Sequence, residues 1–182
     1  MKIFIINGRG GCGKDTFVEL CAKHVPKYMC LNISTVDRVK EIARFCGWDG
    51  GKEDKDRKFL SDLKALLTEY SDMPHQSVLH SIALFKADLE RYDMNSDEAI
   101  VFIHCREPEA IERLRQELDA VTVLIRRPTL ENHAYGNVSD DGVANYGYHF
   151  TIVNDGTLED LESRAVALLA ANNVKIIHKQ RR

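Results

Sequence analysis

The sequence lacks long hydrophobic runs. Its unbroken apolar stretches are short, as in Ile3–Ile6 and Ala99–Ile103, whereas a membrane-spanning helix needs about 20 residues. The N-terminal MKIFII reads as a strand and has no small-residue cleavage site of a signal peptide. We therefore expect a cytoplasmic protein that does not bind membranes.

An excess of positive charge is also missing. The chain has 25 Lys and Arg against 28 Asp and Glu, a net charge of −3 at pH 7. No basic field is available to hold a polyanion without specificity, so nucleic acid polymers are not expected as partners. With 182 residues, of which 44% are hydrophobic, the chain is long enough for one domain with its own core.

The cysteines lack the spacing of disulfide, redox or zinc motifs. The five cysteines form no C-x-x-C pair and no Cys/His spacing of a zinc site, so reduced thiols are expected. Cys12 lies in a glycine-rich stretch directly ahead of a predicted helix. At such a place the pKa of a thiol can be lowered, which would make it reactive; the alternative is that Cys12 is a small loop residue.

Short runs rich in Ile and Val alternate with segments of helical period. This alternation predicts an α/β fold with a parallel sheet, and the continuous apolar runs indicate strands buried on both faces. The predicted strands are residues 2–6, 29–33, 99–103, 121–125 and 150–153, with 174–177 as a possible sixth.

Several helices can be recognised between these strands. An apolar stripe of helical period covers residues 59–70, a second covers 76–91, and we expect both stripes to pack into the core. Pro108 opens a further helix, and Thr157 with Asp160 forms a variant capping box ahead of the last one.

The glycine-rich stretch after the first strand matches the spacing G-x-x-x-x-G-K. Gly8, Gly13 and Lys14 occupy its fixed positions, between a strand and an amphipathic segment. This is the context of a P-loop, whose backbone amides bind phosphate at a helix N-terminus; the alternative is a glycine-rich turn. Residues predicted to bind the nucleotide here are Gly8, Arg9, Gly10, Gly11, Cys12, Gly13, Lys14, Asp15 and Thr16.

Two residues of this loop carry specific chemistry. Lys14 is expected to bridge the β- and γ-phosphate oxygens of ATP as their charge shifts. Asp15 stands where a Ser or Thr usually reaches the magnesium ion. Because a carboxylate is a hard oxygen ligand, Asp15 is the predicted Mg²⁺ ligand.

The sequence GKD followed by Thr16 resembles the P-loop nucleoside and nucleotide monophosphate kinase group. The phage-type deoxynucleoside monophosphate kinases and animal-type phosphomevalonate kinases are closest in this motif. The resemblance is specific over residues 8–16. Over nearly all of the remaining chain, only the order of the predicted elements is similar. The resemblance implies a three-layer P-loop kinase fold in one domain, 1–182, with a five- or six-stranded sheet. It also implies an acceptor-binding helical lobe at about 36–95, a lid at about 127–149, and ATP with Mg²⁺.

The same resemblance assigns roles after the second strand. There Asp37 would orient a hydroxyl or a magnesium-bound water, and Arg38 or Lys40 would meet a substrate phosphate. The alternative reading of Asp37 is the first turn of a helix. Further along, Arg57 is similar to an arginine that grips the acceptor phosphate, although it also lies in a solvated charge run.

Three more places complete the expected site. Arg106 matches an arginine that binds acceptor phosphate, while His104 stands where the family's Walker B acid is expected. Arg126 and Arg127 precede the lid and correspond to arginines that clamp the phosphoryl group. Asn154 and Gly156 follow the fifth strand, in a loop that packs on adenine in this group; a turn before the Thr157-capped helix is the alternative.

The expected activity is ATP-dependent phosphoryl transfer to a small phosphorylated acceptor, foremost a nucleotide or deoxynucleotide monophosphate. Lys14, Arg106 and Arg126 would be catalytic, joined by Asp37 as base if the acceptor is a hydroxyl. Alternatives are a catalytically weak ATP-binding sensor, or a kinase of a non-nucleotide metabolite such as phosphomevalonate or dephospho-coenzyme A. A monomer and a homodimer are both compatible with the sequence.

Overall fold

A computed structural model of the chain describes residues 1–26, 28–131 and 146–177. Its centre is a five-stranded, wholly parallel sheet of order β2-β3-β1-β4-β5. The strands are β1 (Lys2–Asn7), β2 (Cys30–Ser34), β3 (Ile100–His104), β4 (Val121–Arg126) and β5 (Phe150–Val153). The predicted α/β class and the five strands are confirmed.

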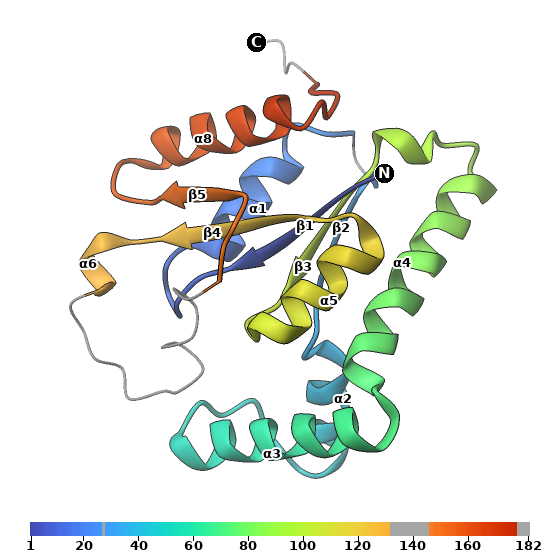
Figure 1. Cartoon of the computed structure of the whole chain (residues 1–182), viewed down its shortest axis with the longest axis vertical. Helices are drawn as coiled ribbons and strands as arrows, with labels where there is room; N and C mark the ends of the chain where they lie inside the picture. The colour runs from blue at the N-terminus through green and yellow to red at the C-terminus, as the bar shows by residue number, and fades with distance from the viewer. Residues whose placement is uncertain (27, 132–145, 178–182) are drawn as a thin grey trace.

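Helices cover both faces of this sheet (Figure 1). They are α1 (Lys14–Ala22), α2 (Asp37–Phe45), α3 (Asp54–Ser71), α4 (Met73–Arg91), α5 (Pro108–Leu118), α6 (Pro128–Glu131) and α8 (Leu158–Ala171), with a short 3₁₀ helix at Ser96–Glu98. None of the helices in the described ranges has the length and apolar composition needed to cross a membrane.

The core lies in two layers, one on each face of the sheet. On one face, buried side chains of α1 and α8, including Phe17 and Leu168, pack against Phe4 and Phe102. On the other face, Val78 of α4 and the α5 residues Ile111 and Leu114 pack against alternate residues of β1 and β3. Because successive strand residues point to opposite faces, each strand serves both layers, as its continuous apolar sequence predicts.

The predicted sixth strand is wrong. Residues 174–177 are irregular, although Val174 and Ile176 still pack against the core layer of α1 and α8. The amide of Ile177 donates a hydrogen bond of 2.9 Å to the carbonyl of His24. The segment therefore runs beside the end of α1, not along a sheet edge, and its apolar residues serve packing alone.

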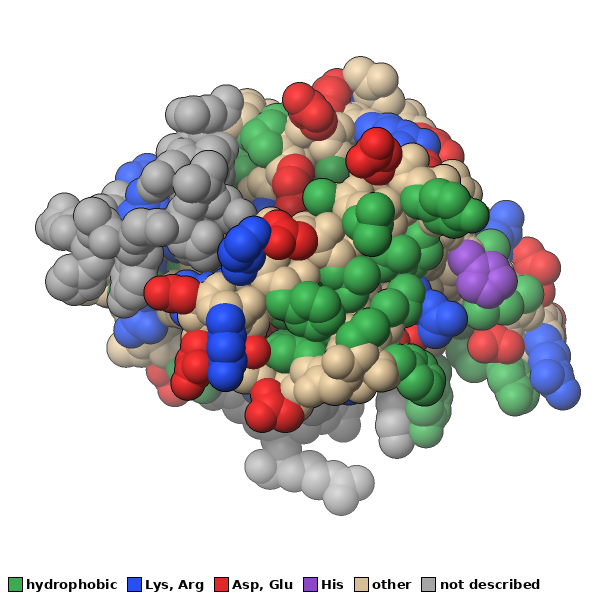
Figure 2. Space-filling model, turned by 90° about the horizontal axis from the view of Figure 1, so that it is seen from below, with side chains coloured by type: hydrophobic (Ala, Val, Ile, Leu, Met, Phe, Trp, Pro, Cys, Tyr) green, Lys and Arg blue, Asp and Glu red, His purple; other side chains and the backbone are tan. Residues whose placement is uncertain are grey.

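The expectation that both helical stripes enter the core is only half right. On α4, Val78 and Leu89 are buried, but no side chain of α3 is. Leu66 and Tyr70 of α3 are 62% and 87% exposed. The reason is that α3 packs on α2 and α4, below the sheet in Figure 1. Seen from below, this end of the molecule carries a gathering of hydrophobic side chains (Figure 2).

The predicted helix starts are confirmed. Pro108 occupies the first turn of α5. At α8 the capping box is complete: the amide of Asp160 donates to Thr157 Oγ1 at 3.2 Å, and the amide of Thr157 donates to Asp160 Oδ2 at 2.8 Å. These two bonds satisfy amides that the helix itself leaves unpaired.

A polar junction joins the α3–α4 turn to the main body. Asp72 is the single residue between the two helices and has a left-handed backbone, φ 52°. Arg113 of α5 donates two hydrogen bonds to its carboxylate, at 2.9 and 2.7 Å. His75 Nε2 lies 2.7 Å from Glu117 Oε2 one helical turn away. The start of α4 is thereby fixed to α5.

We predict that Arg113→Gln destabilises the fold at this junction. The free energy of unfolding at pH 7 should fall by roughly 1 kcal/mol, since the pair is bidentate but partly exposed. Arg113 holds the pKa of Asp72 below its usual value by donating these hydrogen bonds. The contribution is therefore complete above about pH 4 and is lost as the pH falls further.

Urea denaturation of both proteins across pH 2 to 7 measures this difference, which should vanish at the acidic end. Lys58→Gln is the control, because it removes a single exposed pair, Lys58 with Asp62, within α3. An equal loss of stability in the two variants would contradict a special role for the Asp72 junction.

Candidate active site

The predicted P-loop curls over the carboxyl ends of two strands. Gly8 has φ 149°, and a methyl group there would lie 2.4 Å from the carbonyl oxygen of Ile125 in β4. Gly13 has φ 95°, and a methyl group there would lie 2.5 Å from Asn154 Nδ2, directly after β5. The two fixed glycines of the motif are thus required by close contact as well as by backbone conformation.

Lys14 begins α1 and folds back into the loop. Its ammonium donates to the carbonyl oxygens of Gly8 and Arg9, at 2.6 and 2.9 Å. The N-cap residue of α1, Gly13, has no side chain that could cap the helix. The first amides of α1 are therefore available to an anion, and a positive charge lies beside them.

Cys12 is a structural residue of the loop. It is 1% exposed, and burial raises the pKa of its thiol, outweighing the opposite effect of the Lys14 ammonium. The hypothesis of a reactive Cys12 with a lowered pKa is therefore wrong. Asn154 Nδ2 donates to the carbonyl of Cys12 at 2.9 Å, which ties the loop to the end of β5. All five cysteines are free thiols.

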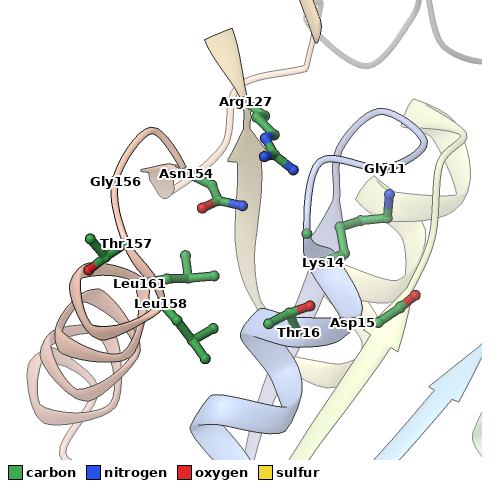
Figure 3. Close-up of a pocket in the computed structure, with 11 residues that line it drawn as sticks. Gly11, Lys14, Asp15, Thr16, Arg127, Asn154, Gly156, Thr157, Leu158 and Leu161 are labelled. Atoms are coloured by element: carbon green, nitrogen blue, oxygen red, sulfur yellow. The ribbon is translucent and has the colours of Figure 1, made fainter. Parts of the chain in front are cut away.

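A cavity of about 400 Å³ lies between the loop and the start of α8 (Figure 3). Leu158 and Leu161 of α8 project toward Thr16 of α1, and the amide of Asn154 points toward the loop. We refer to this space as the first cavity. It is lined by Gly11, Gly13, Lys14, Asp15, Thr16, Arg127, Asn154, Gly156, Thr157, Leu158 and Leu161.

A second cavity, of about 1430 Å³, opens on the other side of Lys14. Its walls come from the loop, the ends of β2 and β3, and the helices α2 and α3. Gly11, Lys14 and Asp15 line both cavities. The charged and imidazole side chains of the second cavity are Lys14, Asp15, Asp37, Lys40, Asp54, Arg57, Lys58, Asp62, Lys64, His104, Arg106 and Glu107.

Most of the predicted site residues line one of these two cavities. Asp37, Arg57 and Arg106 line the second, whereas Arg127 lines the first. Asp37 also begins α2, and its carboxylate accepts a 2.7 Å hydrogen bond from the amide of Ser34. Both readings of Asp37, as helix start and as site residue, are therefore compatible with its position.

Five predicted residues do not line either cavity: Gly8, Arg9 and Cys12 of the loop, and the two arginines Arg38 and Arg126. Arg38 is exposed on α2 and pairs with Glu41 at 2.5 Å. Arg126 ends β4 and is also exposed. The lid predicted at 127–149 falls largely on residues 132–145, which lie outside the described part of the chain.

His104 stands at the carboxyl end of β3, where an acid was expected from the resemblance. Its Nε2 lies 2.9 Å from Asn32 Oδ1 and 4.0 Å from Asp15 Oδ1. Burial lowers the pKa of His104, and the nearby carboxylates of Asp15 and Asp37 only partly oppose this effect. The neutral form of the ring is thereby favoured, and an imidazole in either form supplies none of the negative charge of the expected acid.

An ion pair that the sequence did not predict crosses the second cavity. Lys64 Nζ lies 2.6 Å from Glu107 Oε1, joining α3 to the loop before α5. Burial raises the pKa of Glu107, but the Lys64 ammonium and hydrogen bonds from the backbone amides of Arg106 and Glu107 together lower it, so the net shift is downward and the carboxylate is ionised. No signal in the sequence marked this pair, because Lys64 lies beside the apolar stripe of α3 and Glu107 is 43 positions away.

The residues present fit a magnesium ion that is shared with a nucleotide. Among the described residues, no three His, Cys, Asp or Glu side chains converge on one point. Mg²⁺ is commonly held by one or two carboxylates together with phosphate oxygens and water. The Asp15 carboxylate, 88% exposed at the junction of the two cavities, meets that requirement.

Comparison with known proteins gives distant likenesses only. No family model and no curated protein matches the chain. A sugar kinase from Janibacter is 15% identical with a TM-score of 0.46, over 98% of this chain and 99% of its own. Shikimate kinase from Aquifex aeolicus is 15% identical with a TM-score of 0.47, over 94% and 98%. The APS kinase of Mycobacterium tuberculosis is 11% identical with a TM-score of 0.41, over 93% and 96%.

We predict that Gly8→Ala destabilises the protein. The methyl group would meet a backbone carbonyl, which cannot move aside, and would hold a backbone angle that alanine disfavours. The free energy of unfolding should fall by about 2 to 3 kcal/mol, measured by chemical denaturation. In Gly10→Ala the methyl group meets no atom within 4 Å, and a change within about 0.5 kcal/mol is expected. Equal stability of the two variants would show that the loop is not pressed against β4.

Proposed function

We propose that the protein is an ATP-dependent phosphotransferase that acts on a small phosphorylated acceptor, foremost a nucleotide or deoxynucleotide monophosphate. The observation that carries this proposal is that two cavities meet at Gly11, Lys14 and Asp15 of a P-loop. A reaction between two bound molecules needs two adjoining sites with the transferred group at their junction. A protein that only binds or hydrolyses a nucleotide needs a single binding site.

The first cavity is the proposed ATP site. The phosphates would take the amides of residues 8–16, and Lys14 would exchange the carbonyls of Gly8 and Arg9 for phosphate oxygens. Leu158 and Leu161 offer an apolar surface to the base, beside the loop of Asn154 and Gly156. Arg127, which lines this cavity, is better placed for the donor phosphates than for the acceptor.

The second cavity is the proposed acceptor site, with residues 36–95 as the acceptor lobe of a single domain. Arg106 leaves the end of β3 close to the loop, and Arg57 comes from the start of α3. Both are proposed to bind the acceptor phosphate, and Arg106 and Lys14 to neutralise charge as the phosphoryl group transfers. A phosphate acceptor needs no strong base; Asp37 would serve an acceptor hydroxyl. The roles predicted for Arg38 and Arg126 have no support from the positions of these residues, which line neither cavity.

Magnesium is the proposed metal, held by Asp15 together with phosphate oxygens and water. A bound Mg²⁺ supplies positive charge that offsets the charge developing on the transferring group. It would also offset the repulsion between the Asp15 carboxylate and the nucleotide.

Phosphoryl transfer across an acceptor panel tests the activity. The panel contains ribo- and deoxynucleoside monophosphates, phosphomevalonate and dephospho-coenzyme A, each with ATP and Mg²⁺ and read by mass spectrometry. Lys14→Met should reduce transfer to the preferred acceptor by about 100- to 1,000-fold, the effect of losing a group that stabilises transition-state charge. Lys86→Met is the matched control and should keep full activity, because Lys86 lies on the exposed side of α4, outside both cavities.

Failure to convert any acceptor, with ATP still bound, would contradict the phosphotransferase. The second candidate, an ATP-binding sensor without turnover, would then be favoured. The specific observation on its side is the imidazole ring of His104 at the strand end where an acid was expected.

The metal assignment is tested separately. Asp15→Ala should raise the Mg²⁺ concentration needed for half-maximal ADP binding by about 10-fold, read with a fluorescent ADP analogue. Asp15→Ser places the hydroxyl common in P-loops at this position and should stay close to the original protein. An unchanged Mg²⁺ requirement in Asp15→Ala would remove Asp15 from the metal site.

A further inference from the structure

Asn7 joins three separate parts of the site through one buried amide. It ends β1 and is 1% exposed. Its Oδ1 accepts a 2.7 Å hydrogen bond from the amide of Gly8, the first residue of the P-loop. Its Nδ2 donates to the carbonyl of Arg106 at 3.2 Å and to the hydroxyl of Tyr148 at 2.7 Å. Both N–H groups of this amide are therefore used, and the side chain has a single orientation.

Tyr148 accepts one of the two hydrogen bonds that the Asn7 amide donates. It lies two residues ahead of β5, on the segment that leads back into the sheet. Its ring contacts that of Tyr146 edge-on at 5.0 Å, and both pack against the core layer of α4 and α5. Burial raises the pKa of Tyr148 to about 12, so its hydroxyl is neutral and can accept from Asn7.

The Arg106 backbone leaves the sheet at this point. β3 ends at His104, and the amide of Cys105 donates a long bond of 3.3 Å to the carbonyl of Ile6. The next carbonyl along the chain is that of Arg106, and Asn7 binds it. The Asn7 amide thus binds the backbone of Arg106, a residue that lines the second cavity.

We propose that Asn7 and Tyr148 are positioning residues that fix Arg106 relative to the P-loop and thereby set the affinity for the acceptor phosphate. This inference rests on the proposed function, in which Arg106 binds that phosphate. Neither side chain lines either cavity, so both act through Arg106. The Gly8 amide, bound on the opposite side of the same Asn7 side chain, is the fixed point against which Arg106 is placed.

Tyr148→Phe is the first test, because it removes one hydroxyl and keeps the ring packing. The freed Asn7 amide loses its fixed orientation, and the KM for the acceptor should rise by about 3- to 10-fold, the worth of one hydrogen bond. The KM for ATP should stay within about 2-fold, since the loop amides beyond Gly8 are untouched. A purely structural role would instead change both constants together, or only the thermal stability.

Tyr146→Phe is the matched control on the same segment. It removes a 2.7 Å hydrogen bond to Glu112 of α5 but touches neither Asn7 nor Arg106, so both KM values should remain unchanged. Asn7→Asp is the second variant. It keeps an oxygen for the Gly8 amide and can accept the Tyr148 proton, but it sets a carboxylate against the Arg106 carbonyl. It should raise the acceptor KM more than Tyr148→Phe does. Because its charge also lies beside the P-loop, the comparison with the KM for ATP is made with Tyr148→Phe.

A binding measurement separates this inference from the proposed activity. The Arg106 Nε–H signal is followed by NMR while inorganic phosphate is added to the ADP-bound protein. Phosphate should bind about 3- to 10-fold more weakly in Tyr148→Phe than in Tyr146→Phe or the unaltered chain. If this pattern appears without transfer to any acceptor, the positioning role stands and the phosphotransferase does not. Equal phosphate binding in all three, no response of Arg106, or equal changes in both KM values would overturn the positioning role.

Discussion

The absence of side chains at two positions of the P-loop is the constraint on which the rest of the site depends. At Gly8 the backbone lies against the Ile125 carbonyl, and at Gly13 it lies against the Asn154 amide. These contacts bring the loop within reach of the ends of β4 and β5, and Asn154 then binds it through Cys12. The first cavity, between the loop and α8, exists because the loop is held this close to the sheet.

Opposite charges face each other across the junction of the cavities. Lys14 and Arg106 lie near the P-loop, and Lys40, Arg57 and Lys64 extend the positive charge along the second cavity. Asp15, Asp37 and Glu107 lie among them, and Glu107 is already paired with Lys64. Lys14 is held by the carbonyls of Gly8 and Arg9, and Arg57 by the carbonyl of Lys52. An anionic ligand would therefore meet cations that are already held in place, an arrangement that needs little rearrangement when charge moves between bound groups.

Structural features that depend on residues close together in the sequence could be predicted. The strands follow from continuous apolar runs, the start of α8 from Thr157 and Asp160, and the P-loop from the spacing of Gly8, Gly13 and Lys14. Contacts between distant segments were not. The Lys64–Glu107 pair joins residues 43 positions apart, and the Asn7–Tyr148 bond spans 141; no periodicity encodes either. The prediction that α3 packs into the core was wrong for a related reason. An apolar stripe predicts a helix but does not show which other element covers its apolar face.

The lack of buried side chains in α3 has a consequence for motion. Local opening of a segment costs the contacts it makes, and a helix without buried residues can loosen while the sheet stays intact. Because α3 supplies Arg57 and Lys64 to the second cavity, one wall of that cavity is a helix without buried side chains. We therefore expect this wall to shift at lower energetic cost than the strand ends opposite it, so that ligands of different size can be bound.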